Sequence, residues 1–305
     1  MIIQCICPKW SMGMPWVEGI KKVFTRDGVE VDFRPEPDYA LQPAAVLYLW
    51  CDEVARRNIN ASPEGSNNYV VFRRYEFFTG EWGQIVWSKV RHLIFVNDVF
   101  RIEFESAFPE KPVPTSVIYN AVDPDIWTYS EHKHGKNIAM VGYINQKKNF
   151  PLALQILAAL PEDYTLHIIG GVQCPETYMY LCQMAHKLKR NLIVHEAQSR
   201  QVLNRTLDQM DYLLCTAISE GNPNNVNEAM MKGIKPLVHC WPGADWQYPK
   251  DCVFSTVYEA INRIIPNDDV ESGYDSKFYR SWAEDKFSLK NLEALRALVL
   301  APHAV

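Results

Sequence analysis

The sequence predicts an α/β protein built on parallel sheets that helices cover on both faces. Short apolar segments alternate with segments whose apolar residues recur at helical spacing, and this alternation runs through most of the chain. The strand segments are apolar at nearly every position, which is typical of strands buried on both faces. The 305 residues are 48% hydrophobic and 22% charged, an ordinary globular composition with enough apolar material for two domains.

The first half of the chain follows this plan less clearly. A helix predicted over 15–28 follows the first strand, with Pro15 near its start and Gly28 after its end, as helix termini prefer. The predicted strands are 2–7, 29–33, 44–51, 69–75 and 92–98.

The second half has a more regular rhythm of strand and helix. Between the halves, four prolines interrupt the apolar run 109–127, so the chain is predicted to form two consecutive α/β units. The predicted strands are 137–144, 165–170, 191–196, 211–219, 234–240 and 252–255. The predicted helices are 150–160, 176–189, 199–210, 224–233 and 256–265.

Composition and charge disfavour several classes of protein. A net charge of −5 and a pI near 5.9 give no strong positive field for binding nucleic acid. No apolar segment is long enough to span a membrane, and no charged leader with a cleavage site opens the chain. The eight cysteines lack a metal-type pairing, and His132 and His134 have no third ligand nearby. We therefore expect free thiols in the cytoplasm and no metal site.

The most informative stretch is ISEGNPNNVNEAMMKG, residues 218–233. It begins at the carboxyl end of a predicted strand, the edge at which open parallel sheets bind ligands. Asn222 is a favourable helix N-cap and Pro223 suits the first helical position. The backbone N–H groups of Asn224 and Asn225 would then point outward from a helix start, which attracts phosphate.

Two glutamates flank this expected anion site. Glu220 precedes the helix, and Glu228 lies about one and a half turns inside it, so the two carboxylates can contact different parts of one elongated ligand. A phosphate ester with hydroxyl groups at both ends, such as a nucleotide sugar, fits this arrangement. The alternative is a simple helix cap, because an acid near a helix start stabilises the helix by about 0.3–1 kcal/mol without any ligand.

The stretch resembles the E-x(7)-E motif of retaining family 4 glycosyltransferases, in the variant EG-x-PN-xxx-EAM. Glu220 and Glu228 occupy the two acidic positions of the motif, and Gly233 follows it. Further segments resemble family elements in the family's order, and the likeness covers residues 115–265 well and the N-terminal half only loosely. These segments are 117–127, 140–154, 166–171 and 235–249.

The resemblance implies a GT-B fold, in which two Rossmann-like doubly wound domains face each other across a cleft. The expected domains are a short acceptor-binding domain (1–115), a nucleotide-sugar-binding domain (116–272) and a helical tail (273–305) that crosses back to the first domain. The implied activity is metal-independent transfer of a hexose, with retained configuration, from a UDP- or GDP-sugar to a hydroxyl acceptor. The acceptor would be a glycan, a lipid-linked glycan or another metabolite, as in polysaccharide biosynthesis.

The family also implies cationic contacts to the diphosphate, from an arginine and a lysine five residues apart. The lysine position corresponds to Lys148, after the glycine of the family element at Gly142, whereas the arginine position is Tyr143. Either Lys147 or an arginine of the first half compensates for the missing charge, or activity is low. Gly13 corresponds to the family's glycine loop, where the backbone approaches the donor phosphates.

The acceptor side is less clearly marked. Glu76 and Arg74 lie just after a predicted strand, where Glu76 would bind or deprotonate an acceptor hydroxyl unless it forms an internal ion pair with Arg74. The family often has a histidine near this place, and this chain has none there. The first half is dense in aromatic residues, most of them expected in the core and one or two available to stack on an acceptor sugar.

Two other functions remain open on the same fold. One is a nucleotide-sugar epimerase, which would need acid–base residues that the sequence does not identify. The other is a degenerate protein that binds a nucleotide sugar without transferring it, which the absent arginine and histidine favour. The donor base, the sugar, the acceptor, the oligomeric state and any peripheral membrane association stay open.

Overall fold

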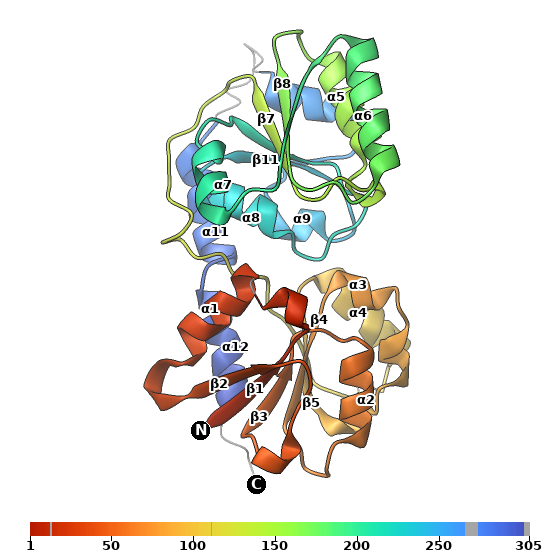
Figure 1. Ribbon diagram of the computed structural model, residues 1–305, viewed down its shortest axis with the longest axis vertical. Helices are drawn as coiled ribbons and strands as arrows, with labels where there is room; N and C mark the ends of the chain where they lie inside the picture. Colours follow the sequence, from red (N-terminus) through yellow and green to blue (C-terminus); the bar gives the residue numbers. More distant parts are fainter. Residues whose placement is uncertain (13, 111, 266–273, 302–305) are drawn as a thin grey trace. The chain divides into compact units, whose positions relative to one another are not determined.

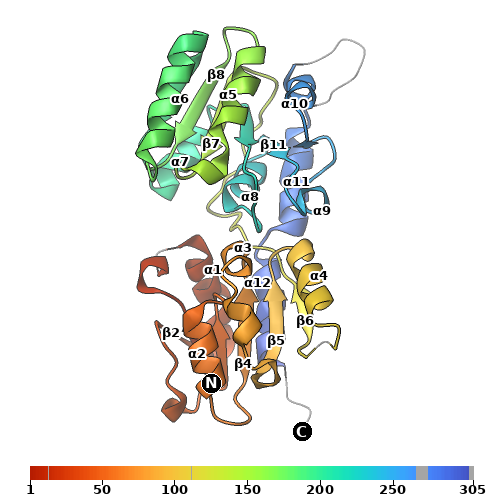
Figure 2. The same ribbon diagram turned by 90° about the vertical axis from the view of Figure 1, so that its right-hand side faces the viewer.

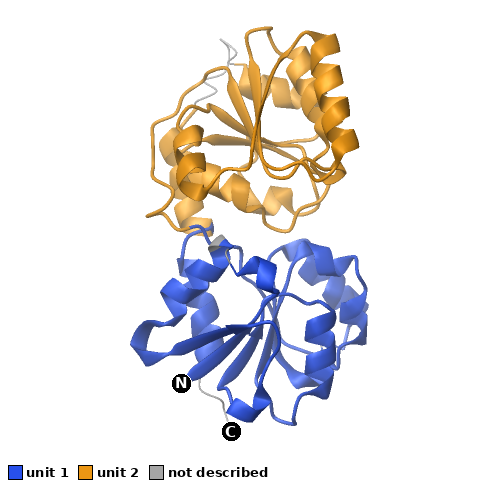
Figure 3. Ribbon diagram, viewed as in Figure 1, with its two compact units in different colours: residues 1–122, 287–305 blue, residues 123–286 orange. Residues whose placement is uncertain are grey.

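The computed structural model describes residues 1–12, 14–110, 112–265 and 274–301. The chain forms two compact units, shown in separate colours in Figure 3. The N-terminal unit combines Met1–Val122 with Phe287–Val305, and the C-terminal unit is Asp123–Lys286. No helix in the described ranges is long and apolar enough to cross a membrane.

The N-terminal unit is built on six parallel strands in the order β2-β1-β3-β4-β5-β6 (Figure 1). The five strands expected from the sequence are present, and a sixth, β6, pairs in register with β5. The strands are β1 (Ile2–Ile6), β2 (Glu30–Arg34), β3 (Ala45–Tyr48), β4 (Asn68–Phe72), β5 (Val90–Phe95) and β6 (Thr115–Val117).

Two apolar cores lie on the two faces of this sheet. Along β1, Ile3 and Cys5 face a core closed by helices α1 and α12, whereas Ile6 faces a core closed by α2 and α4. This alternation follows from the two-residue period of a strand and explains why β1 carries apolar residues toward both faces. The helices are α1 (Pro15–Phe24), α2 (Glu53–Ala61), α3 (Arg74–Phe77), α4 (Asp98–Ala107) and α12 (Lys290–Leu300).

Helices α2 and α4 were not expected from the sequence, although their start signals are present. The side chain of Asp52 accepts a hydrogen bond from the Ala55 backbone N–H, and Asn97 accepts one from that of Val99. Each residue is therefore an N-cap that follows directly on an apolar run. The expected helix over 15–28 ends at Phe24.

The C-terminal unit contains a second sheet of six parallel strands, in the order β12-β11-β10-β7-β8-β9. All six strands expected in this half are present. They are β7 (Asn137–Val141), β8 (Thr165–Ile169), β9 (Asn191–His195), β10 (Tyr212–Cys215), β11 (Lys235–His239) and β12 (Val253–Phe254).

Helices cover both faces of this second sheet (Figure 2). One face carries α5, α6 and α10 over a single apolar core that includes Phe150, Leu181 and Ile264. On the other side α8 packs against α11. The helices are α5 (Phe150–Ala159), α6 (Pro175–Leu188), α7 (Arg200–Leu207), α8 (Asn224–Met231), α9 (Ala244–Gln247), α10 (Val257–Ile264) and α11 (Ser276–Lys286).

The ends of the units differ from the domain limits expected from the sequence. The expected limit at residue 115 falls inside β6, which belongs to the N-terminal unit. The expected start of the tail, residue 273, lies outside the described residues. Helix α11 belongs to the C-terminal unit, and α12 packs on α1 in the N-terminal unit, where Arg26 pairs with Glu293 at 3.0 Å.

Each sheet has one point at which the direction of strand succession reverses. In the N-terminal unit this point lies between β1 and β3, and in the C-terminal unit it lies between β7 and β10. Successive connections leave such a pair of strands on opposite faces, which opens a crevice at the carboxyl edge where α/β proteins bind ligands. The two switch points therefore locate one candidate site in each unit.

Candidate functional site

The candidate site of the C-terminal unit is the turn from β10 to α8, beside the carboxyl end of β7. Two hydrogen bonds hold this turn against the short helix η6 (Gln146–Lys148). The hydroxyl of Thr216 donates to the Lys148 carbonyl at 2.7 Å, and the backbone N–H of Ile218 donates to the Lys147 carbonyl at 3.1 Å. The fold thus brings together two segments that lie about 70 residues apart in the sequence.

Three charged side chains converge at this turn. Lys148 Nζ lies 2.8 Å from Glu220 Oε1, and Lys147 Nζ lies 3.1 Å from Glu220 Oε2. Glu220 is 8% exposed. Burial alone raises the pKa of its carboxyl, but the Lys148 and Lys147 ammonium groups outweigh burial and hold that pKa below its ordinary value. The cluster is therefore ionised and carries one positive charge more than it has negative charges.

Two glycines let the chain segments approach each other at this edge. A Cβ on Gly170 would lie 2.1 Å from the Gly142 carbonyl oxygen, so only glycine fits between the ends of β7 and β8. A Cβ on Gly142 would lie 3.2 Å from Lys148 Cε, so the lysine side chain passes directly over this glycine. Gly142 and Lys148 are thus neighbours in space.

Tyr143 lies at the same edge and is 52% exposed. Its ring packs over Gly171, 3.6 Å from where a Cβ of that glycine would be. A phenol supplies one hydroxyl and no positive charge. The two ammonium groups paired with Glu220 belong to Lys147 and Lys148.

Asn222 does not cap α8, so that expectation was wrong. The helix begins at Asn224 with Pro223 in the N-cap position, and no side chain caps it. The Asn222 amide instead donates to Gln247 Oε1 at 2.6 Å and accepts from Asn227 Nδ2 at 2.9 Å. Pro223 takes the N-cap position, and the side chain of Asn222 instead forms part of a buried amide network.

This network was not anticipated, although the density of amides in the stretch was its signal. The Gln247 amide also donates to the Gly221 carbonyl at 2.8 Å, and the Tyr248 hydroxyl donates to Asn227 Oδ1 at 2.9 Å. Asn222, Asn227 and Gln247 are almost entirely buried. Hydrogen-bonded groups in such surroundings specify one loop conformation, because an unpaired partner would be costly.

The two asparagines that open α8 differ in their contacts. Asn225 Nδ2 donates to the Val141 carbonyl at 2.7 Å and so ties the helix start to the end of β7. Asn224 Oδ1 is buried, and none of the described residues donates a hydrogen bond to it. The start of α8 therefore faces the β7 edge and carries one unsatisfied acceptor.

Glu228 lies in the second turn of α8 and is only 7% exposed. Burial raises the pKa of its carboxyl to about 8, against the opposing effect of the Arg200 guanidinium. Within the described ranges, no residue donates a hydrogen bond to this carboxyl. Hydrogen-bond donors to this carboxyl can therefore come from solvent or from a ligand.

The acceptor-side residues are less favourably placed than expected. Glu76 is fully buried, and Oε1 accepts from the Cys51 backbone N–H at 3.2 Å. Burial raises the pKa of this carboxyl, opposed by backbone N–H groups and by the guanidinium of Arg73. The alternative, an internal ion pair with Arg74, does not form, because Arg74 lies over the Phe78 ring. Gly13 lies outside the described residues.

Metal-ligating residues do not gather in the part of the chain that the structure describes. No group of three or more His, Cys, Asp or Glu side chains there is arranged to hold a metal ion. The positive charge at the β10–α8 turn comes from Lys147 and Lys148, which the fold already holds against Glu220.

A segment of the C-terminal unit matches a known protein family. Residues 125–245 match the family described as "Glycosyl transferases group 1", and this segment contains the lysine pair and both glutamates of the turn. Among curated proteins, none matches the sequence of the chain.

Solved structures resemble the chain over almost its whole length. Anabaena Alr3699/HepE in complex with UDP and glucose aligns with a TM-score of 0.75 at 13% identity, covering 99% of both chains. Sucrose-phosphate synthase from Thermosynechococcus elongatus aligns with a TM-score of 0.77 at 10% identity, covering 99% of this chain and 100% of that one. The lipopolysaccharide outer core galactosyltransferase WaaB aligns with a TM-score of 0.73 at 15% identity, covering 99% of both chains.

At these identities the structural likeness shows the fold alone. The chain has the GT-B fold of two Rossmann-like units, and its C-terminal unit contains a segment that matches the group 1 glycosyl transferases.

Proposed function

We propose that the protein is a retaining, metal-independent glycosyltransferase that moves a hexose from a UDP- or GDP-linked sugar to a hydroxyl acceptor. The observation that carries the proposal is the convergence of Lys147 and Lys148 on Glu220 at the β10–α8 turn. The family match over 125–245 and the UDP bound by Anabaena Alr3699/HepE support the same reading. In the proposal, Glu220 and Glu228 are the two acids of an E-x(7)-E motif.

The lysine pair would receive the donor diphosphate. The ammonium groups of Lys147 and Lys148 both donate to the single carboxylate of Glu220. These three side chains together therefore carry one net positive charge, which would attract the phosphates. This charge stabilises the leaving group as the bond between the anomeric carbon and the diphosphate breaks and a bond to the acceptor oxygen forms. Lys147 takes the part of the arginine that Tyr143 replaces, so no metal ion is required.

The two acids would hold the two ends of the donor. Glu228 carries a buried carboxyl that no described residue satisfies, which suits the hydroxyl donors of a ribose. Glu220 lies at the mouth of the turn beside the lysines, which suits contact with the transferred sugar. Ribose contacts are equal in ground and transition states, whereas contacts near the breaking bond strengthen as positive charge develops.

Steady-state kinetics of two conservative variants test this assignment. Glu228→Gln is expected to raise the donor KM about tenfold, and Glu220→Gln to lower kcat by a larger factor with little change in KM. The matched control is Glu162→Gln, because this carboxylate belongs to the same unit and its side chain is 90% exposed. If both variants keep wild-type kinetics and lose only stability, the stretch is a structural turn and the assignment is wrong.

A second candidate function rests on Tyr143. Because a neutral residue occupies the position of the family's arginine, the protein would bind a nucleotide sugar without transferring it. Incubation with UDP-glucose separates the candidates: free UDP indicates transfer or hydrolysis, a new epimer indicates isomerisation, and binding alone indicates the degenerate protein. Tyr143→Arg is expected to leave activity unchanged or to raise it under the first proposal.

A further inference from the structure

Two histidines lie next to each other at the outer end of the second sheet, on strands β8 and β9. His167 Nδ1 is 3.1 Å from His195 Nε2, and the two rings are inclined by 16° with their centres 5.4 Å apart. The parallel register places His167 opposite Ile193 and His195 opposite Ile169, so the two histidines are diagonal neighbours on one face of the sheet. Strand β9 is the edge strand, and β7 and β8 separate it from β10.

We propose that His167 and His195 together bind one late first-row divalent cation, of the class Cu²⁺, Ni²⁺ or Zn²⁺, with water in the remaining coordination positions. Imidazole nitrogen is a preferred ligand of these ions, whereas Mg²⁺ and Ca²⁺ prefer oxygen. The bound ion links the edge strand β9 to β8. The inference does not depend on the proposed function, because two strands separate β9 from the β10–α8 turn.

The first argument is the distance between the two ring nitrogens. A histidine nitrogen bonds such an ion at about 2.0–2.1 Å, so two nitrogens that bind one ion at an angle of about 90–110° lie roughly 2.8–3.4 Å apart. The separation of 3.1 Å between His167 Nδ1 and His195 Nε2 falls within this range. In the free protein these two atoms share a hydrogen bond, so each ring has to turn until its lone pair points at the ion. Only side-chain torsions change in this step, and the strand register is kept.

The second argument is that a neighbouring asparagine holds His167 in the form that binds a metal ion. Asn137 Nδ2 donates to the Gln209 carbonyl at 3.2 Å, so Asn137 Oδ1 is the atom that faces His167 Nε2, at 3.4 Å. An amide oxygen only accepts hydrogen bonds, so Nε2 carries the proton of the His167 ring and Nδ1 presents its lone pair to His195. Burial and the neighbouring His195 also lower the pKa of His167, which keeps its ring neutral at pH 7. Histidines that bind metal ions are oriented in the same way, by a hydrogen bond from the second ring nitrogen to an oxygen.

The third argument is that this face of the outer strands is open to solvent. Strand β9 directs Leu192 and Val194 toward the apolar core under α5, α6 and α10, whereas Ile193 on the other face is 45% exposed. His167 and His195 lie on the same face as Ile193 and are half-buried, so an ion with its water molecules can reach both rings. In the described part of the chain, no third His, Cys, Asp or Glu is placed to join the pair. Water therefore completes the coordination, which suits an exchangeable ion more than a permanent structural one.

The test measures metal binding to the untagged full-length protein, so it does not depend on turnover. Protein freed of metal with EDTA and then of EDTA by gel filtration is titrated with Cu²⁺, and the electron paramagnetic resonance spectrum shows how many nitrogens bind the ion. We expect one tight Cu²⁺ per chain with two nitrogen ligands, and at least a tenfold loss of affinity for His195→Ala. The matched control is His186→Ala, because this histidine is exposed on α6 in the same unit.

A second measurement separates a metal site from a hydrogen-bonded pair that only supports the fold. His195→Gln keeps a side-chain N–H donor for His167 but removes the imidazole ligand, so its Tm in EDTA should equal that of the wild type. Ni²⁺ or Zn²⁺ should raise the Tm of the wild type and of His186→Ala, and should leave that of His195→Gln unchanged. Equal Cu²⁺ affinity in the wild type and His195→Ala, a spectrum without two nitrogen ligands, or a Ni²⁺-dependent rise in Tm that persists in His195→Gln would mean adventitious binding only and would overturn the site.

Discussion

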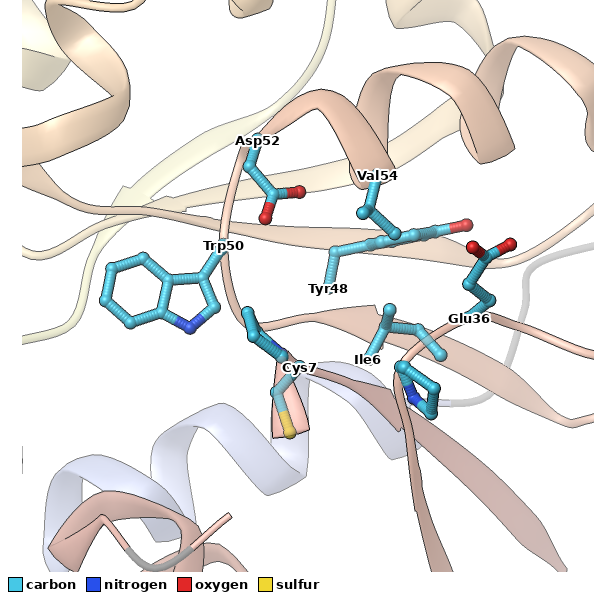
Figure 4. A pocket seen from close by; sticks show the side chains of 9 residues that line it. Ile6, Cys7, Glu36, Tyr48, Trp50, Asp52 and Val54 are labelled. Carbon is cyan, nitrogen blue, oxygen red and sulfur yellow. The ribbon is translucent and has the colours of Figure 1, made fainter. Parts of the chain in front are cut away.

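The two sheets present different chemistry at equivalent points of the same topology. At the switch point of the C-terminal unit, Lys147, Lys148 and Glu220 form a nearly buried charge cluster. At the switch point of the N-terminal unit, Trp10 and Trp50 form an aromatic pair, and Trp50 also lines a pocket of about 140 Å³ with acidic side chains (Figure 4). Parallel-sheet topology creates a crevice in both units, whereas the residues that follow each strand determine what the crevice binds.

The difference also shows how each edge is kept rigid. The charged edge is held by hydrogen bonds, including the buried network of Asn222, Gln247 and Asn227. The aromatic edge is held by packing, since Arg73 lies over both Trp16 and Trp50. Hydrogen-bonded charges suit an anion that must be bound in one orientation.

The largest effect is expected at the charged edge. Lys148→Ala should lower kcat/KM for UDP-glucose by on the order of a hundredfold or more, because one preorganised charge contact to the diphosphate is lost. The matched control is Lys136→Ala, whose side chain is 58% exposed in the same unit. Unchanged turnover of Lys148→Ala would assign the cationic role to Lys147.

The amide network should contribute to stability more than an exposed helix cap would. Asn222→Ala is expected to lower the free energy of unfolding by about 1–3 kcal/mol, because Gln247 and Asn227 lose a buried partner. Urea denaturation measures this change. Asn222→Ser separates the two roles: a serine restores a helix cap but cannot replace both amide contacts, so full rescue by serine would restore the capping interpretation.

A smaller effect is expected in the pH dependence of donor binding. Burial raises the pKa of Glu228 to about 8, so the free protein holds this carboxyl protonated at neutral pH. Ribose hydroxyls that donate to the carboxylate would lower its pKa on binding, so binding releases a proton. Affinity for UDP-glucose should therefore rise up to about tenfold per pH unit as the pH approaches 8, and then level off.

Calorimetry in buffers of different ionisation enthalpy measures the released proton. UDP-glucose is the suitable ligand because its diphosphate diester does not titrate in this range. Glu228→Gln should abolish the slope. The same linkage predicts that the wild type loses stability as the pH rises from about 4.5 to about 8, since only the unfolded chain ionises Glu228 there, and that the variant does not. A slope that persists in Glu228→Gln would place the titrating group elsewhere.

The smallest effect is expected from removing metal ions. If Lys147 and Lys148 supply the charge that stabilises the diphosphate, excess EDTA should leave the turnover of UDP-glucose unchanged. Loss of activity in EDTA that Mn²⁺ or Mg²⁺ restores would contradict the proposed role of the lysine pair.

Most of the fold could be predicted because its strands are apolar and its helices periodic. All eleven predicted strands are present, and the sixth strand of the first sheet, Thr115–Val117, was hidden by the prolines around it. Helices α2 and α4 were missed, although each has an apolar face and their caps Asp52 and Asn97 are present in the sequence. The turn around Glu220 was located correctly because it follows a strongly apolar strand and precedes a periodic segment.

Which side chains contact each other at these sites could not be predicted, because the contacting residues lie far apart in the sequence. The sequence alone determined two parallel α/β units, the place of the β10–α8 turn and the residue types available there, because these follow from local periodicity and chain order. Only the tertiary structure decided that Lys147 and Lys148 share Glu220, that Asn222 binds Gln247 instead of capping α8, and that Trp10 lies against Trp50. These contacts join residues from separate loops, and their geometry is set by sheet order and packing, which no local pattern encodes.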